Sequence, residues 1–326
     1  MPLSFTETLV VGISSRALFD LEEENKLFQE QGIFEYRKYQ KEREGEVLMP
    51  GTGFHLIKAL LNLNKLAEER LVEVIVMSRN SPETGIRVLN SIKHYGLDIT
   101  RSAFTGGEPL FDYIEAFDVD LFLSKEESDV QKVIDSKTAA AALIYAHPPG
   151  FEPETSTVRI AFDADAVIFS DESEQIYKTG GLDAFHKNEV ENEGTPLKEG
   201  PYAKLLLMLS KIQRKMSTGV ELSPLRLAIV TARNSPSHMR VIHTLREWDV
   251  YIDEAFFLGG LSKDKVLKAF RAHIFFDDQD AHLIAAQAVV PAGRVPYHSN
   301  SPLHIKEEEL KIIDPSVLAK TEIKKF

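Results

Sequence analysis

Short apolar runs alternate with longer amphipathic stretches along most of the chain. Strands are predicted where branched or aromatic apolar residues cluster, at 9–13, 72–77, 119–123, 160–162 and 225–230. Helices are predicted where apolar residues recur three or four positions apart, at 53–69, 88–95 and 241–248. Strands without a polar face are typical of parallel sheets that helices cover on both sides. The pattern therefore predicts an α/β fold.

The second half of the chain repeats the order of the first. R-N-S-P occurs at 79–82 and again at 233–236, in each case after a strand and before a helix and a Gly-Gly pair. L-F-D-L-E-E-E at 18–24 resembles I-F-S-D-E-S-E at 168–174. We interpret this as a duplicated parallel-sheet unit. The expected domains are 1–146 and 158–326, joined by the proline-rich, non-periodic linker 147–157.

Two aspartates, Asp163 and Asp165, directly follow one of the predicted buried strands. If the backbone stays extended, both side chains point to the same side. Two carboxylates about 4 Å apart repel by roughly 4 kcal/mol at an effective dielectric near 20. A cation between them, or a proton on one of them, would relieve this repulsion. The alternative is a turn with two solvated aspartates.

The set of candidate residues Asp163, Asp165, Thr231, Lys263, Asp277 and Asp278 occurs in the second half only. Pairing the halves to within about one residue sets Asp163 against Ile13, Asp165 against Ser15, Thr231 against Met77, Lys263 against Leu110, Asp277 against Ser124 and Asp278 against Lys125. Residues needed only for the fold would persist in both copies. This difference favours a functional site in the second half.

The order of these residues resembles the haloacid dehalogenase superfamily of phosphotransferases. The resemblance implies that Asp163 is the nucleophile, Asp165 the acid and base, and that Thr231 and Lys263 hold phosphate. Chemistry agrees, because a carboxylate can form an acyl phosphate and an ammonium group can bind phosphoryl oxygens. Lys265 is the alternative to Lys263.

A hard divalent cation would screen the repulsion between the phosphate and the carboxylates. Magnesium is therefore the expected cofactor. The predicted ligands are Asp163, Asp165 through its backbone carbonyl, and the pair Asp277 and Asp278. Within that pair, Asp278 is the preferred direct ligand and Asp277 orients Lys263, and the reverse assignment is the alternative.

Longer strings resemble the cytosolic 5'-nucleotidase I family over nearly the whole chain. They include S-S-R-A-L-F-D at 14–20, N-S-I-K-H-Y at 90–95, F-D-A-D-A-V-I-F-S-D-E-S-E at 162–174 and A-H-I-F-F-D-D-Q at 272–279. The resemblance implies magnesium-dependent hydrolysis of nucleoside 5'-monophosphates, with AMP a common substrate. It also implies a small cap inserted at about 171–222. The residues expected to contact the substrate are Phe169, Glu172, Ser173, Ala232, Arg233 and Asn234. For Glu172 and Ser173 the alternative is a helix cap.

Composition limits the other functions. The net charge of −12 argues against nucleic acid and anionic membranes as partners, and the absence of cysteine excludes thiolate chemistry. The sequence shows no signal peptide and no apolar run of membrane-spanning length, which predicts a cytoplasmic protein. Self-association into a homo-oligomer is left open. The alternative functions are a phosphatase for another small phosphomonoester and a nucleotide-binding regulator without turnover.

Three roles are considered for the first half. It could be purely structural. It could wall the substrate pocket, with Arg79 or Arg16 near the nucleoside. It could also keep a pocket for a regulatory nucleotide, with Lys125 where the second half would hold a metal.

Overall fold

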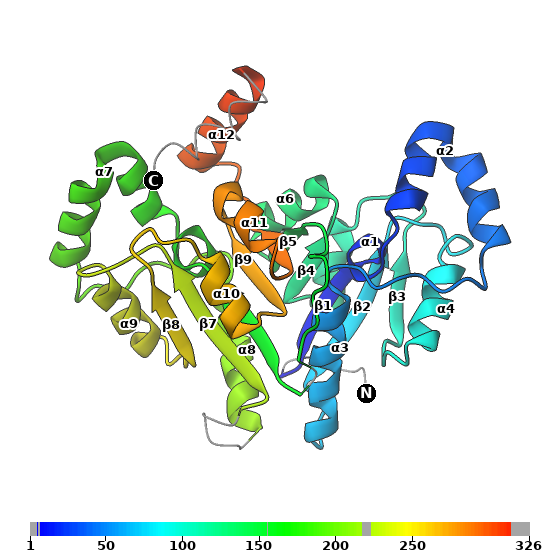
Figure 1. Ribbon diagram of the computed structural model, residues 1–326, viewed down its shortest axis with the longest axis horizontal. Helices are drawn as coiled ribbons and strands as arrows, with labels where there is room; N and C mark the ends of the chain where they lie inside the picture. Colours follow the sequence, from blue (N-terminus) through cyan, green and yellow to red (C-terminus); the bar gives the residue numbers. More distant parts are fainter. Residues whose placement is uncertain (1–4, 6, 155, 217–222, 314–326) are drawn as a thin grey trace.

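The computed structural model describes residues 5, 7–154, 156–216 and 223–313 (Figure 1). Its described strands form a single ten-stranded sheet in the order β3-β2-β1-β4-β5-β10-β9-β6-β7-β8. The strands are β1 Leu9–Ser14, β2 Val72–Ser78, β3 Arg101–Phe104, β4 Leu121–Ser124, β5 Ala140–Ile144, β6 Val158–Phe162, β7 Leu225–Thr231, β8 Glu254–Phe257, β9 Ile274–Asp277 and β10 Ala292–Arg294. The predicted α/β fold with a mainly parallel sheet is confirmed.

The strand order is the same in the two halves when each is followed outward from the centre. The first half runs 5-4-1-2-3 and the second 10-9-6-7-8, and the two meet where β5 pairs antiparallel with β10. All other pairings among the described strands are parallel. Gly293 permits the close approach at this junction, because a Cβ there would lie 3.0 Å from the Cβ of Ala142. The division into two domains stays a prediction, since one sheet runs through both halves.

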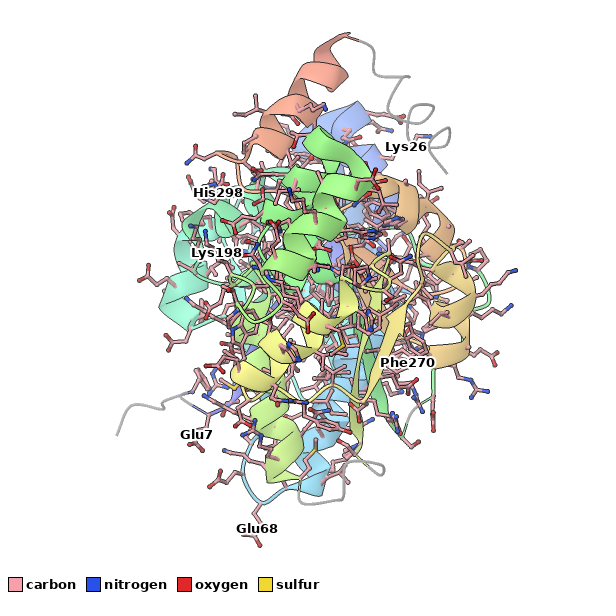
Figure 2. The ribbon with its side chains drawn as sticks, turned by 90° about the vertical axis from the view of Figure 1, so that its left-hand side faces the viewer. Glu7, Lys26, Glu68, Lys198, Phe270 and His298 are labelled. Carbon is pink, nitrogen blue, oxygen red and sulfur yellow. The ribbon has the colours of Figure 1, made fainter. Side chains whose placement is uncertain are left out.

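Helices lie on both sides of the sheet, as the side view shows (Figure 2). Those of the first half are α1 Ser15–Leu18, α2 Glu22–Glu42, α3 Phe54–Leu63, η1 Asn64–Leu66, α4 Ile86–His94, α5 Phe111–Ile114, η2 Glu115–Phe117 and α6 Glu127–Ser136. Those of the second half are η3 Ala164–Ile168, α7 Glu172–Glu191, α8 Ala203–Lys215, α9 His238–Glu247, α10 Asp264–Phe270, α11 Asp280–Ala286 and α12 Pro302–Ile313. None of the helices in the described ranges is both long enough and apolar enough to span a lipid bilayer.

The predicted insertion at 171–222 is wrong in extent and in being confined to the second half. Helix α8 is part of the hydrophobic core, since Leu205, Leu206, Leu209 and Ile212 are buried there. Within this segment α7 extends away from the sheet, and α2 of the first half does the same at the opposite end of the molecule (Figure 1). Both helices bend at a glycine with positive φ, Gly32 at 78° and Gly181 at 76°. Residues 217–222 lie outside the described part of the chain.

Candidate active site

Strand register brings three of the predicted residues to one edge of the sheet. β6 lies between β7 and β9, and the carboxyl ends of these three strands meet. Asp163 directly follows β6, and its N–H donates to the carbonyl of Phe276 at 2.8 Å. Thr231 is the last residue of β7, and Asp277 is the last residue of β9. All three side chains are buried.

Lys263 enters this group from the N-cap position of α10. Its Nζ lies 3.0 Å from Asp163 Oδ1 and donates to Asp277 Oδ2 at 2.7 Å. Burial alone lowers the pKa of Lys263, but Asp163 and Asp277 outweigh burial and hold that pKa well above its usual range. Lys265, the alternative, is exposed. The structure therefore places Lys263, not Lys265, in the site.

Asp163 and Asp277 respond differently to the same surroundings. Burial raises the pKa of Asp163 to about 6, against the opposing effect of Lys263. Burial also raises the pKa of Asp277, but Lys263 and His282 overcome this and hold it well below the usual range. Asp277 Oδ1 additionally accepts the N–H of Gln279 at 2.8 Å. Asp277 is thus the fixed anion of the group.

Asp278 differs from Asp277 in that its pKa is raised instead of lowered. Burial, followed by the charges of Asp277 and Glu174, raises the pKa of Asp278 well above its usual range. Its Oδ2 accepts a hydrogen bond from the Tyr297 hydroxyl. Its Oδ1 is buried and has no hydrogen-bond partner within the described ranges. An unpaired buried carboxylate oxygen is costly, so Asp278 offers a free ligand atom for a cation.

A metal would meet oxygen donors at this position. Ligand atoms of Asp163, Asp277 and His282 lie within 4.8 Å of one another. Two of these three donors are carboxylates, and carboxylate oxygens suit a hard divalent cation such as Mg²⁺. Asp278 is not one of the three, although the charge of Asp163 adds to the rise in the pKa of Asp278. The donor set fits the predicted cofactor. His282 was not predicted, although it follows the acidic pair closely in the sequence.

Asp163 and Asp165 both have extended φ and ψ, but the backbone does not stay extended between them. A π-helical turn begins at Ala164, and the N–H of Phe169 donates to the Ala164 carbonyl at 2.9 Å, five residues back. Ala166 adopts φ 59° within this turn. In the first half, an ordinary α-turn occupies the same place, where Phe19 donates to Ser15, four residues back. The second half therefore carries one additional residue beside Asp165.

Asp165 is held by Arg233 rather than by solvent. The guanidinium donates from Nε to Asp165 Oδ2 at 2.7 Å and from Nη2 to Oδ1 at 2.6 Å. The Nη1 atom of Arg233 donates to Glu189 Oε2 at 2.5 Å. Two parallel bonds fix the plane of the carboxylate as well as its position. Asp165 also lies close enough to raise the pKa of Asp163 further.

Glu189 and Glu174, both in α7, belong to the site but were not predicted. Glu189 is buried and accepts from Arg233, Arg240 and Ser173. Burial raises the pKa of Glu174 to about 7, since Lys178 compensates it only in part. Glu174 Oε1 accepts from Gln279 Nε2 at 3.2 Å. The acidic string D-E-S-E at 171–174 indicated this segment in the sequence. Its last residue, Glu174, is the one that belongs to the site.

Several predicted substrate contacts lie elsewhere. Phe169 is fully buried and packs on Trp248, so its prediction as a substrate contact is wrong. Glu172 is exposed and pairs with Lys198, whose side chain is 73% exposed. The other predicted contacts divide into Ser173 and Arg233, which are buried and bonded within the protein, and Ala232 and Asn234, which are exposed beside the site.

The pairing between the halves shifts by one residue at two positions. Thr231 Oγ1 accepts the N–H of Arg233 at 3.2 Å, as Ser78 Oγ accepts the N–H of Asn80 at 3.2 Å. Ser78 is therefore the counterpart of Thr231, in place of Met77. Similarly, Asp163 precedes η3 as Ser14 precedes α1, so Ser14 replaces Ile13 as its counterpart.

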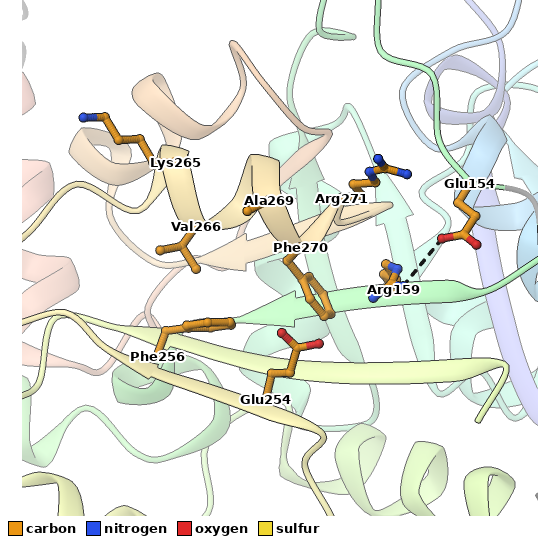
Figure 3. A pocket seen from close by; sticks show the side chains of 9 residues that line it. All are labelled: Glu154, Arg159, Glu254, Phe256, Lys265, Val266, Ala269, Phe270 and Arg271. Atoms are coloured by element: carbon orange, nitrogen blue, oxygen red, sulfur yellow. Dashed lines mark ion pairs between the residues drawn. The ribbon is translucent and has the colours of Figure 1, made fainter. Parts of the chain in front are cut away.

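A cavity of about 550 Å³ in the second half lies away from these residues (Figure 3). It is lined by Arg159 near the start of β6, Glu254 at the start of β8 and the last turn of α10. The acidic cluster lies at the other end of β6. This cavity therefore does not belong to the site.

Comparisons with known proteins agree with the sequence resemblance. A family model described as 5'-nucleotidase matches residues 1–302. The chain is 37% identical over 288 residues to human cytosolic 5'-nucleotidase 1B, covering 86% of this chain and 47% of that protein. The chain thus spans about half the length of this curated relative. No solved structure matches the chain.

Proposed function

The chain belongs to the 5'-nucleotidase family, and from this premise we propose that it hydrolyses nucleoside 5'-monophosphates, with AMP as the main substrate, to nucleoside and phosphate. The observation that carries the proposal is the buried group of Asp163, Lys263 and Asp277 at adjoining strand ends. We further propose that each half is a haloacid dehalogenase-like unit. The relative's name supports a cytosolic location.

Asp163 is the proposed nucleophile. A carboxylate oxygen attacks phosphorus, the bond from phosphorus to the ester oxygen breaks, and an aspartyl phosphate forms. Water then attacks phosphorus of the aspartyl phosphate, which releases phosphate and restores the carboxylate. The ion pair with Lys263 supports this role, because it favours the charged form of Asp163 in a buried position.

Lys263 and Thr231 are the proposed phosphate-binding residues. Lys263 brings three donors and a positive charge close to the nucleophile. The Thr231 hydroxyl accepts the N–H of Arg233, which leaves its own proton for a phosphoryl oxygen. Donors placed in advance where charge develops contribute strongly to catalysis.

Asp165 is the proposed general acid and base. It would give a proton to the leaving ester oxygen and later take one from the attacking water. Arg233 engages both of its oxygens, so Asp165 must release at least one of these hydrogen bonds to reach the substrate. Arg233 is then a positioning residue, and Glu189 in turn positions Arg233.

Mg²⁺ is the proposed cofactor. Asp163, Asp278 and the backbone carbonyl of Asp165 would hold it, and Asp277 would orient Lys263. When bound, the cation neutralises charge on the phosphate.

Phosphate release from AMP by the full chain tests the proposal. We expect turnover with Mg²⁺, loss of turnover with EDTA, and a decrease of at least about 10³-fold in Asp163→Asn. Turnover that survives this substitution would exclude the proposed nucleophile. A higher kcat/KM for a phosphomonoester that is not a nucleotide would favour the broader phosphatase alternative. AMP binding without phosphate release would favour the regulator.

A further inference from the structure

The first half contains a cavity of about 370 Å³ at the carboxyl ends of β1, β2 and β4, next to α2. The strands β6, β7 and β9 occupy the same places in the second half and carry the catalytic residues there. The cavity is therefore the first-half counterpart of the catalytic site. Its floor has kept polar residues but has lost the carboxylates that follow the strands.

On this floor, three serines stand at the positions that two aspartates and a threonine occupy in the catalytic site of the second half. Ser14 stands for Asp163, Ser78 for Thr231 and Ser124 for Asp277. Each hydroxyl oxygen accepts a backbone N–H, from Ala17 at 3.2 Å, Asn80 at 3.2 Å and Glu126 at 3.1 Å respectively. Within the described ranges, the Ser14 and Ser124 hydroxyls donate to no protein acceptor that we observe. Their protons are directed at no protein group and can serve an anion in the cavity.

Two cations border the same floor. Lys125 takes the place of Asp278, and Arg16 follows the serines in α1. Both pair with the single carboxylate of Glu22, at 2.7 Å and 3.2 Å. Arg16 Nε is buried and has no hydrogen-bond partner among the described residues. The floor thus has spare donors and positive charge.

Two of the remaining acidic groups at the cavity, Asp129 and Glu24, already have cationic partners. Asp129 receives two hydrogen bonds from Arg79, at 2.9 Å and 2.6 Å. Glu24 pairs with Arg87 at 2.6 Å. Glu126, at the rim, accepts from the Ser128 hydroxyl at 3.0 Å. The charges of Asp129 and Glu24 are therefore already compensated and do not cancel those of Lys125 and Arg16.

The wall of the cavity includes two large apolar side chains. Phe28 and Ile33 of α2 line it and are 44% and 42% exposed. Counted from the kink glycines, their counterparts in α7 are Tyr177 and Leu182, exposed by 43% and 53%. Both helices therefore present an aromatic and an aliphatic residue at equivalent positions.

We propose that this first-half cavity binds a phosphomonoester with an apolar ring system, such as a nucleotide, and does not hydrolyse it. The phosphate lies against the Ser14 and Ser124 hydroxyls and Lys125, and the ring lies against Phe28 and Ile33. No carboxylate stands at the position of the nucleophile, so the bound ester stays intact. Because the floor is positively charged, it can hold the phosphate without a metal. In the other half, the four carboxylates repel a phosphate, so a metal would be needed there.

Binding stoichiometry tests the site in the full chain. The probe is a nucleoside monophosphate analogue with a methylene group in place of the ester oxygen, which no phosphatase can cleave at that bond. Calorimetry with Mg²⁺ should show two sites per wild-type chain and one site in Lys125→Met. The matched control is Lys215→Met, which removes another lysine paired with a glutamate and should keep two sites.

The remaining site in Lys125→Met should be the catalytic one. The analogue should therefore inhibit AMP hydrolysis with an unchanged inhibition constant, and kcat should stay within twofold. Ser124→Ala removes a donor without changing charge and should weaken the first-half site at least tenfold. Each variant is compared with wild type by circular dichroism and thermal unfolding, so that a loss of binding is separated from a loss of fold.

One site in the wild type, or two unaltered sites in both Lys125→Met and Ser124→Ala, would overturn the proposal. Inorganic phosphate is the second probe. If inorganic phosphate binds the first-half cavity with an affinity at least tenfold below that of the analogue, the result supports the role of Phe28 and Ile33. Equal affinity would contradict that role. These readouts are independent of turnover, so the proposed hydrolysis can fail while this site stands.

Discussion

The ammonium group of Lys263 lies between two buried carboxylates, 2.7 Å from Asp277 and 3.0 Å from Asp163. One cation therefore compensates two anions, and the group keeps a net negative charge in a place that water hardly reaches. This imbalance is expensive unless a further cation joins it. The imbalance explains why the donor set suits a divalent metal. It also explains why loss of Lys263 should affect both activity and stability.

We predict that Lys263→Met lowers kcat for AMP by about 10²–10³-fold, because a donor aimed at the phosphate is lost. Stability should also fall, by roughly 3–5 kcal/mol, since the substitution leaves buried carboxylates without their partner. Initial rates and urea unfolding measure the two effects. The exposed Lys265→Met is the control and should change neither. The assignment of Lys263 would be wrong if Lys265→Met were the inactive variant.

We predict that Arg233→Lys lowers kcat by about 10–100-fold with a smaller change in KM. A lysine keeps the charge but cannot give Asp165 two parallel hydrogen bonds, so the acid and base lose their orientation. Steady-state kinetics separate the two constants. Arg226→Lys is the control, because Arg226 pairs with Glu254 away from the site. A rise in KM alone would show that Arg233 binds substrate instead.

We predict that the two neighbouring aspartates have separable roles. Asp278→Asn should raise the Mg²⁺ concentration for half-maximal activity at least about tenfold, since it removes the free carboxylate oxygen. Asp277→Asn should mainly lower kcat at saturating Mg²⁺, because Lys263 loses its anchor. Activity measured against Mg²⁺ concentration in the two variants shows which aspartate binds the metal and which orients Lys263. The opposite pattern would reverse the assignment.

The positions of the candidate site residues were predictable because strand ends are visible in the sequence. The apolar runs fix where β6, β7 and β9 end, and parallel strands bring those ends together. Phe169 could not be placed in the same way. It lies within an acidic string, yet its side chain is part of the core on Trp248. Local polarity indicated where the segment lies but not which way each side chain points.

The π-turn was missed although the sequence contains its trace. Ser14 and Asp163, which precede the two turns, are 149 residues apart, whereas Leu18 and Ile168, which end the turns, are 150 residues apart. The one-residue difference is the additional residue at Asp165. Helix α8 was likewise readable, since its apolar residues recur at helical spacing and are buried. The edge strands β3 and β8 have only four residues each and are not fully buried, so periodicity predicts them poorly.

His273 should make the stability of the protein depend on pH. It is buried, accepts the N–H of Arg159 at Nδ1 and faces the Glu154 carbonyl at Nε2, 3.1 Å and 2.9 Å away. Burial lowers its pKa to about 4, below the ordinary value of 6.5. Between these two pH values the unfolded chain binds a proton that the folded protein does not.

Stability should therefore be complete above about pH 6.5 and be lost progressively as the pH falls towards 4. The loss from this residue is about 3 kcal/mol, from the difference in pKa. His273→Asn removes the titration, so urea unfolding between pH 7 and pH 4 should show a shallower decline than in wild type. His94→Asn, at an exposed position, is the control and should follow the wild type. Parallel declines in wild type and His273→Asn would show that the buried imidazole does not contribute.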